Sequence, residues 1–158
     1  MSKSSNVQGK LVLLIGPSGV GKSIILKRLR QRHPELHFPR SATTRKRRPR
    51  EGDDLYRFVT EEEFDRLKTA GKLLEWASVH NAGCYGTLID EIIPAIEKGM
   101  IVVREVDVQG FESIRSHPLF AGGKPRYDLQ SIFILPESKE QLIHRITRRA
   151  PISEEELR

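Results

Sequence analysis

The run GPSGVGKS, from Gly16 to Ser23, has the residue types and spacing of a loop that binds phosphate. It fits the pattern G-x-x-x-x-G-K-S, in which glycines let backbone N–H groups curl around a phosphate group. The Lys22 side chain then reaches the β- and γ-phosphates of a nucleoside triphosphate, and the Ser23 hydroxyl ligates Mg²⁺. We therefore predict a nucleoside triphosphate site formed by Gly16, Pro17, Ser18, Gly19, Val20, Gly21, Lys22 and Ser23.

The elements that this loop needs lie on either side of it. The apolar stretch 11–15 predicts a buried strand, and a helix is expected from the end of the loop to about Arg32. A helix in this position points its positive N-terminal end at the bound phosphate. The alternative is a glycine-rich turn that binds nothing. It is disfavoured because the motif is complete and both of its flanks agree with it.

Strands and helices alternate along the rest of the chain, which predicts an α/β fold with a largely parallel sheet. Further strands are expected over 56–59, 73–79, 100–106 and 131–135, the last two of them buried in the core. Capping signatures predict helices over 60–71, over 87–98 with Thr87 as the N-cap, and over 138–148. The segment 117–128 is expected to be a surface loop.

Composition favours a single globular domain in a reducing compartment. The chain has 158 residues, of which 37% are hydrophobic and 30% are charged, enough to bury a real core. No apolar run approaches the roughly 20 residues of a membrane span, and residues 1–9 lack an apolar signal core. Cys84 is the single cysteine, so no internal disulfide can form. We expect a cytoplasmic protein with no membrane partner.

The segment 40–50 carries much of the net charge of +6. Taken alone, this arginine-rich run is typical of a nuclear localisation or RNA-binding patch. It lacks the aromatic residues that single-strand binders use for stacking. Beside a phosphate loop, a second anionic small molecule is the better interpretation, and we expect no nucleic-acid partner. A nucleic-acid-binding protein stays an alternative that this run alone supports.

Six further motifs make the chain resemble a guanylate kinase from about Leu11 to Arg158. They are SATTR (41–45) with Arg48, YRFV (56–59), LEWA (74–77), YGT (85–87), EVDVQG (105–110) and IFILP (132–136). The resemblance implies transfer of the γ-phosphoryl group of ATP to GMP, giving ADP and GDP, with ATP and Mg²⁺ as cofactors. It also implies a three-layer P-loop core with a parallel sheet, a small mixed α/β lobe that binds GMP, and a mobile lid.

The resemblance treats residues 1–158 as one domain. Its core is expected over about 8–35 and 98–140, its GMP-binding lobe over about 36–97, and its lid over about 141–158. Members of the family continue through another helix, a final core strand and a closing helix. We therefore expect the lid to be truncated and the chain to be the front part of a longer protein. The sequence indicates no oligomeric state.

The resemblance also assigns roles around GMP. Bidentate arginines suit a phosphate group, and the family's phosphate-binding arginines correspond to Arg45 and Arg48. The family's hydroxyl partners correspond to Ser41, Tyr56 and Tyr85. The guanine base is expected to meet two acceptors on Glu75 and an O6 donor on Thr87, and Asp107 is expected to face the bound GMP.

Acids and arginines complete the expected machinery. Glu105 ends a predicted core strand and is expected near the phosphate loop and the water shell of the metal, which Ser23 ligates. Arg145 and Arg149 correspond to lid arginines of the family, although a basic end of a helix is an alternative for such residues. We expect Lys22, Arg45, Arg48 and Arg149 to supply positive charge to the transferring phosphoryl group.

A protein of another class could share the motifs. Guanylate-kinase-like modules bind phosphorylated peptides through the GMP lobe and do not catalyse phosphoryl transfer. Such modules typically have degraded phosphate loops. The complete loop at 16–23 therefore favours the enzyme over this alternative.

Overall fold

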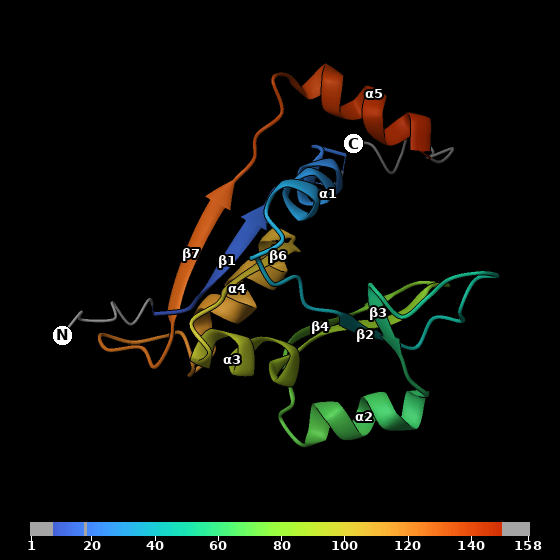
Figure 1. Cartoon of the computed structure of the whole chain (residues 1–158). Helices are drawn as coiled ribbons and strands as arrows, with labels where there is room; N and C mark the ends of the chain where they lie inside the picture. The colour runs from blue at the N-terminus through green and yellow to red at the C-terminus, as the bar shows by residue number, and fades with distance from the viewer. Residues whose placement is uncertain (1–7, 18, 150–158) are drawn as a thin grey trace.

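The computed structural model describes residues 8–17 and 19–149, which form two halves with one sheet each (Figure 1). The strands are β1 (Lys10–Ile15), β2 (Ser41–Thr43), β3 (Tyr56–Phe58), β4 (Leu73–Val79), β5 (Gly83–Leu88), β6 (Ile101–Val106) and β7 (Asp128–Phe133). The helices are α1 (Lys22–Arg32), α2 (Glu61–Thr69), α3 (Ile89–Glu97), α4 (Val108–Ser116) and α5 (Lys139–Arg149).

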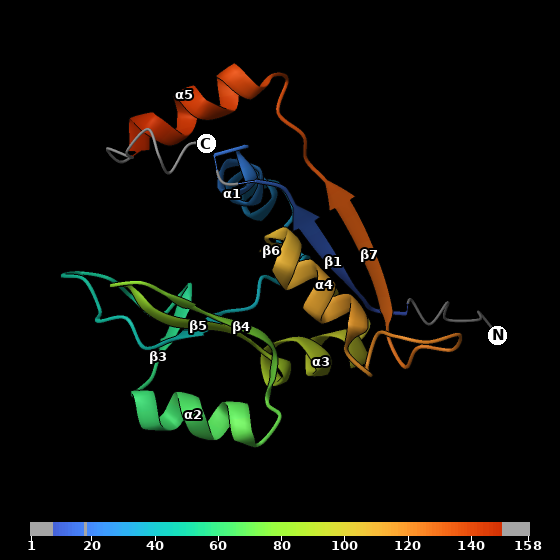
Figure 2. The same ribbon diagram turned by 180° about the vertical axis from the view of Figure 1, so that it is seen from behind.

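The first half is a three-layer core around a parallel sheet of order β6-β1-β7. Helix α1 lies on one side of this sheet and α4 on the other (Figures 1 and 2). On the α4 side, Leu11, Leu13 and Ile15 of β1 pack in one buried cluster with Ile92 of α3 and Ile114 of α4. The predicted α/β fold with a parallel core sheet is confirmed.

The register between β1 and β6 fixes the edge of the core where chemistry is expected. Leu14 lies opposite Glu105, and Ile15 lies opposite Val106. Parallel strands have their carboxyl ends at the same edge of a sheet. The phosphate loop, which starts at Gly16, therefore lies beside the acidic end of β6.

The second half is a small lobe with a mixed sheet of order β3-β2-β5-β4, against which α2 packs. Strands β2 and β3 are parallel, whereas β5 is antiparallel to both β2 and β4. Phe64 of α2 is 1% exposed and packs with Ala42, Leu73 and Leu88. The lobe thus has its own small core, separate from that of the first half.

The predicted N-cap of α3 is wrong. Thr87 belongs to β5, and the helix begins at Ile89 with Leu88 at the N-cap and no capping hydrogen bond from a side chain. The Thr87 hydroxyl is instead bonded to two side chains, Glu75 and Arg104. The Thr87 hydroxyl therefore bonds to residues distant in the chain and does not cap the helix as the local sequence pattern predicted.

The expected buried strand over 131–135 is also corrected. Strand β7 covers Asp128–Phe133 and, within the described residues, pairs with β1 alone. Ile132 and Phe133 are 51% and 54% exposed, and Leu135 is 79% exposed. Its apolar composition predicted a core position, but the strand lies at the edge of the sheet.

Two strands and one helix were not predicted. Strand β2 lies within the arginine-rich segment 40–50, and β5 follows a turn at residues 80–82. Helix α4 starts after Asp107, whose Oδ1 accepts a hydrogen bond of 2.7 Å from the Gly110 N–H. An aspartate in front of a helix is a recognised N-cap signal, so this helix start could have been found. Within the described residues, no helix is long and apolar enough to cross a membrane.

The capping box of α2 provides a test of the fold. The Thr60 hydroxyl accepts from the Glu63 N–H at 3.1 Å, and Glu63 accepts from the Thr60 N–H at 2.8 Å. We expect Thr60→Ala to lower the unfolding free energy by about 1 kcal/mol, because the orphaned N–H loses its partner. Urea denaturation measures this change.

The matched control is Thr69→Ala in the last turn of the same helix. Thr69 is exposed, and its hydroxyl makes no hydrogen bond to the described residues. We expect this change to stay within about 0.5 kcal/mol. Equal losses in the two variants would contradict the role given to the capping box.

Candidate active site

The phosphate loop leaves β1 at Gly16 and enters α1 at Lys22. Gly19 and Gly21 have φ angles of +80° and +107°, where a side chain would strain the backbone. The Lys22 ammonium donates to the carbonyl oxygen of Gly16 and to that of Pro17, the latter at 3.5 Å. The Lys22 side chain thus lies across the loop that its backbone helps to form. Ser18 lies outside the described residues.

Ser23 and Glu105 bring two oxygen donors together beside the loop. The Ser23 Oγ donates to Glu105 Oε2 at 3.5 Å, joining the first turn of α1 to the end of β6. The described residues contain no cluster of three or more His, Cys, Asp or Glu able to hold a metal. Mg²⁺ commonly takes only one or two protein oxygens and fills its octahedron with water and phosphate oxygens. This pair of hard oxygen donors therefore suits Mg²⁺ bound together with a nucleotide.

The lobe sheet aligns the residues that were expected to bind GMP. Its registers place Tyr56 opposite Ser41, Ser41 opposite Thr87, and Thr87 opposite Glu75, in one row across the four strands. Residues paired across strands, and residues two apart on one strand, point to the same face. Tyr85 is two residues before Thr87 and shares that face. The sheet thus brings five predicted residues together.

The Tyr56 end of this row lies beside Arg45. Its guanidinium forms two hydrogen bonds to the Glu51 carboxylate, at 2.6 and 3.0 Å. It also lies over the Tyr56 ring at 5.2 Å from the centroid, and the Tyr56 and Tyr85 rings meet edge to face at 6.0 Å. Glu51 was not predicted as a site residue, although it holds the arginine that was.

Glu51 also orders the backbone of the arginine-rich loop. Its Oε2 accepts from the Arg48 N–H at 2.8 Å. The hydrogen bonds from Arg45 and from the Arg48 backbone lower the pKa of Glu51 from its ordinary 4.5 to about 2. Glu51 in turn raises the pKa of Arg45. The loop is therefore organised by one ionised carboxylate at its centre.

The other end of the row is a buried polar cluster. The Thr87 hydroxyl donates to Glu75 Oε1 and accepts from the Arg104 Nε–H at 2.7 Å. The Arg104 Nη2 lies 3.7 Å from Glu75 Oε1. Burial lowers the pKa of Arg104, against the opposite influence of the Glu75 and Glu105 carboxylates. Arg104 was not predicted, because its place beside Glu75 depends on how the two halves meet.

A cleft of about 320 Å³ joins the two halves at this point. The phosphate loop, the end of β6, the start of α4 and the lobe all line it: Pro17, Gly19, Gly21, Lys22, Ser23, Glu75, Arg104, Glu105, Val106, Asp107 and Gly110. A smaller cavity of about 90 Å³ includes Ser41, Tyr56, Arg104 and Glu105 in its lining. Arg45 and Arg48 line a separate depression with Thr44 and Gly83. The structure therefore groups the loop with Glu75 and Asp107, and leaves the two arginines outside the main cleft.

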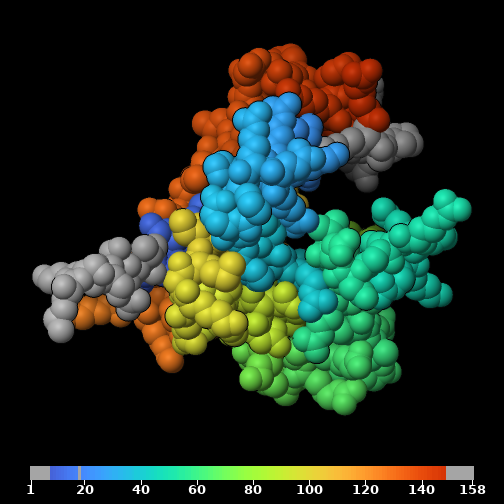
Figure 3. Space-filling model, viewed as in Figure 1, coloured from blue at the N-terminus to red at the C-terminus, as the bar shows by residue number. Residues whose placement is uncertain are grey.

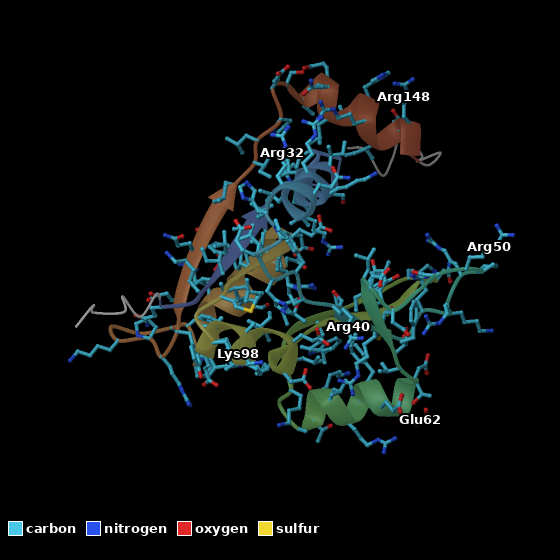
Figure 4. All side chains as sticks on the ribbon, in the orientation of Figure 1. Arg32, Arg40, Arg50, Glu62, Lys98 and Arg148 are labelled. Atoms are coloured by element: carbon cyan, nitrogen blue, oxygen red, sulfur yellow. The ribbon has the colours of Figure 1, made fainter. Side chains whose placement is uncertain are left out.

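The predicted lid begins with α5, which lies over the phosphate loop. The Arg145 Nη1 donates to the Val20 carbonyl at 3.3 Å, and Ile146 packs close to Gly19. Figure 3 shows the surface hollowed between this upper part of the molecule and the lobe. Arg148 on α5 and Arg50 on the lobe lie on opposite sides of that hollow (Figure 4). The Arg149 side chain lies outside the described part of the structure.

A phosphate loop between a parallel strand and a helix, facing a lobe with an arginine-rich loop, is the arrangement of a P-loop nucleoside monophosphate kinase. Residues 8–158 match the sequence model of the family described as Guanylate kinase. The chain belongs to the guanylate kinase family and is an enzyme of the ATP:GMP phosphotransferase class.

Individual relatives agree with this assignment. The chain is 43% identical to a guanylate kinase of Thermosynechococcus vestitus, covering 98% of this chain and 77% of that protein. It is 42% identical to a guanylate kinase of Nocardia farcinica, covering 90% and 70%. The crystal structure of guanylate kinase from Anaplasma phagocytophilum superposes with a TM-score of 0.63 at 28% identity, covering 89% of this chain and 66% of that one. These relatives do not favour the non-catalytic peptide-binding alternative.

The lowered pKa of Glu51 predicts a pH effect on stability. A carboxylate whose pKa falls on folding stabilises the protein above its unfolded pKa, and the contribution is lost as pH falls through the folded pKa. We expect the stability advantage of the wild type over Glu51→Gln to be full above pH 4.5 and to shrink as pH approaches 2. Chemical denaturation at a series of pH values measures this difference.

The Arg45→Met background is the control for this pH effect. Without the guanidinium that contributes most to the shift, Glu51→Gln should change stability with a weaker dependence on pH. An advantage that does not vary with pH in the wild-type background would contradict the pairing of Glu51 with Arg45.

Proposed function

We propose that this chain transfers the γ-phosphoryl group of ATP to GMP, giving ADP and GDP, in the cleft between its two halves. The observation that carries the proposal is that Lys22 and Ser23 of the phosphate loop line the same cleft as Glu75 of the lobe. One cleft thus offers cations and N–H groups for a triphosphate and a carboxylate acceptor for a nucleobase. That combination suits a reaction between two nucleotides.

The phosphate loop is proposed to bind ATP through its backbone N–H groups and the Lys22 ammonium. Ser23 and Glu105 would hold Mg²⁺, Ser23 as a ligand and Glu105 through the metal's water shell. Bound Mg²⁺ would neutralise charge on the β- and γ-phosphate oxygens. Glu105 makes the Ser23 hydroxyl a fixed part of the site by joining it to β6.

The lobe is proposed to bind GMP. Arg45 and Arg48, with Ser41, Tyr56 and Tyr85, would bind the GMP phosphate, and Glu75 would accept from the base. A guanidinium has five N–H donors, so Arg45 can keep Glu51 and still donate to a phosphate oxygen. Thr87 belongs to the base subsite through its hydrogen bond to Glu75, and Asp107 lines the cleft beside it.

Catalysis then consists of alignment and charge. The GMP phosphate is already an anionic nucleophile, so no general base is needed to activate it. Lys22, Arg45, Arg48 and the lid residue Arg149 would neutralise the charge that develops on the transferring oxygens. Closing the cleft would bring Arg45 and Arg48 toward the phosphate loop and exclude water.

We also propose that the protein works in the cytoplasm, where ATP and GMP are available to it. Its single Cys84 is only partly buried and unpaired, which suits a reducing compartment. Its proposed partners are these two small molecules, with no nucleic acid or membrane among them.

Replacing Lys22 tests the role of the phosphate loop. We expect Lys22→Ala to lower ADP formation from ATP and GMP by at least about 100-fold, because it removes the charge nearest the transferring phosphoryl group. Affinity for GMP alone should persist, because Lys22 belongs to the ATP side of the cleft. A coupled assay of ADP formation and calorimetry with GMP measure these two quantities.

Lys27→Ala is the matched control, since Lys27 is exposed on the same helix and its side chain makes no hydrogen bond or ion pair with the described residues. Its turnover should equal that of the wild type. A Lys22→Ala variant with undiminished turnover would overturn the proposal.

A further inference from the structure

Arg104 is a cation that the proposed mechanism does not use. It lies on β6, one residue before Glu105, and its side chain is only 14% exposed. Successive side chains of a strand point to opposite faces. Glu105 faces Ser23 and the phosphate loop, so Arg104 faces the other way, toward Thr87 and Glu75 of the lobe. A single strand therefore serves both halves of the cleft.

In the cluster of Glu75, Thr87 and Arg104, the single hydroxyl proton of Thr87 is already used. A threonine hydroxyl has one proton to donate. The Thr87 hydroxyl donates it to Glu75 and accepts from the Arg104 Nε–H. Thr87 is 0% exposed and does not line the cleft, whereas Glu75 and Arg104 both do. A bound nucleobase would therefore meet Glu75 and Arg104, with Thr87 behind them.

Arg104 has donors to spare. Among the described residues, the Arg104 side chain makes one hydrogen bond, from Nε to Thr87, and its Nη2 forms an ion pair with Glu75 Oε1 at 3.7 Å. The Nη1 and Nη2 groups carry four N–H donors in a planar fork. In the described part of the chain no buried side-chain nitrogen or oxygen lacks a hydrogen-bond partner, and Arg104 lines the cleft, so its Nη donors reach the space that a ligand with acceptors would occupy.

The two side chains complement one base edge. Guanine presents donors at N1 and at its 2-amino group, and an acceptor at O6 beside them. Adenine presents the opposite polarity, with an amino donor where guanine has O6. A carboxylate next to a guanidinium matches the guanine edge, and arginine is a frequent partner of guanine O6 in nucleic-acid recognition.

We propose that Arg104 determines specificity by donating from its Nη groups to guanine O6, while Glu75 accepts from N1–H and the 2-amino group. Thr87 fixes both side chains and does not itself contact the base. This inference rests on the proposed function and replaces the expected role of Thr87 as the O6 donor. Against AMP, the guanidinium would face another donor and leave buried polar groups unpaired.

The test compares GMP with IMP, which keeps O6 and N1–H but lacks the 2-amino group. Binding of each nucleotide to the full chain is measured by calorimetry without ATP, so the result does not depend on turnover. We expect Arg104→Met to weaken GMP and IMP equally, by about 10- to 100-fold, because both lose the O6 donor. Glu75→Gln should weaken GMP more than IMP, because its amide N–H opposes the 2-amino group.

Two further variants serve as controls for the role of Arg104. Arg104→Lys keeps a cation at the buried position, and we expect a smaller loss that is again equal for GMP and IMP. Arg57→Met removes a half-exposed arginine of the same lobe that pairs with Asp90, and its affinities should equal those of the wild type. ATP affinity should be unchanged in all three arginine variants.

Three results would overturn the inference. Unchanged GMP affinity in Arg104→Met would remove the residue from the base site. A loss larger for GMP than for IMP would show that Arg104 acts through Glu75 instead of on O6. An equal loss of ATP affinity would reduce Arg104 to a structural residue. If the wild type binds no purine monophosphate, the proposed function fails and this inference fails with it.

Discussion

The parallel pairing of β1 with β6 is the constraint on which the rest of the molecule depends. It places Ile15 opposite Val106, so the phosphate loop and the acidic end of β6 emerge at the same edge. A slip of β6 by one residue would exchange the faces to which Arg104 and Glu105 point, so the register decides which half of the molecule each of them meets. The same register also points Glu105 at Ser23 and Arg104 at the lobe. One strand pair thus positions both the proposed triphosphate side and the proposed nucleobase side of the cleft.

In the lobe, strand register likewise positions the site residues, which here are polar side chains. Its sheet carries Tyr56, Ser41, Thr87 and Glu75 in one row, and the row ends against Arg104 from the core. Helix α4 approaches closely at that point. A Cβ on Gly110 would lie 3.2 Å from Asp107 Oδ1 and 3.7 Å from the Glu75 carboxyl carbon. Gly110 therefore leaves the space between Asp107 and the Glu75 carboxylate free of a side chain.

Features set by neighbouring residues could be predicted from the sequence. The phosphate loop needs only eight consecutive residues between a strand and a helix, and the Thr60 capping box needs four. The alternation of strands and helices likewise predicted the parallel core, which the structure confirms. The resemblance supplied the row of GMP residues, and the register explains why they belong together.

Features set by distant partners could not be predicted. Local pattern predicts Thr87 as a helix cap, whereas its hydroxyl is hydrogen-bonded to Glu75 and Arg104, 12 and 17 residues away in the chain. Arg104 itself stands in an apolar strand, where pattern alone marks it as an interruption and says nothing of its partners. Glu51 is close in sequence to its partners Arg45 and Arg48, but its hydrogen bonds to them depend on the conformation of the loop. The apolar residues of β7 predicted a buried strand, but β7 lies at the edge of the sheet and its apolar side chains are half exposed.

The acceptor preference of the wild-type chain tests the account most directly. ADP formation would be followed with ATP and Mg²⁺ and with GMP, AMP or UMP as the second substrate. The paired Glu75 and Arg104 predict turnover with GMP and none above background with AMP or UMP. Turnover with AMP as fast as with GMP, or no turnover with any of the three, would contradict a guanine-specific phosphotransferase in this cleft.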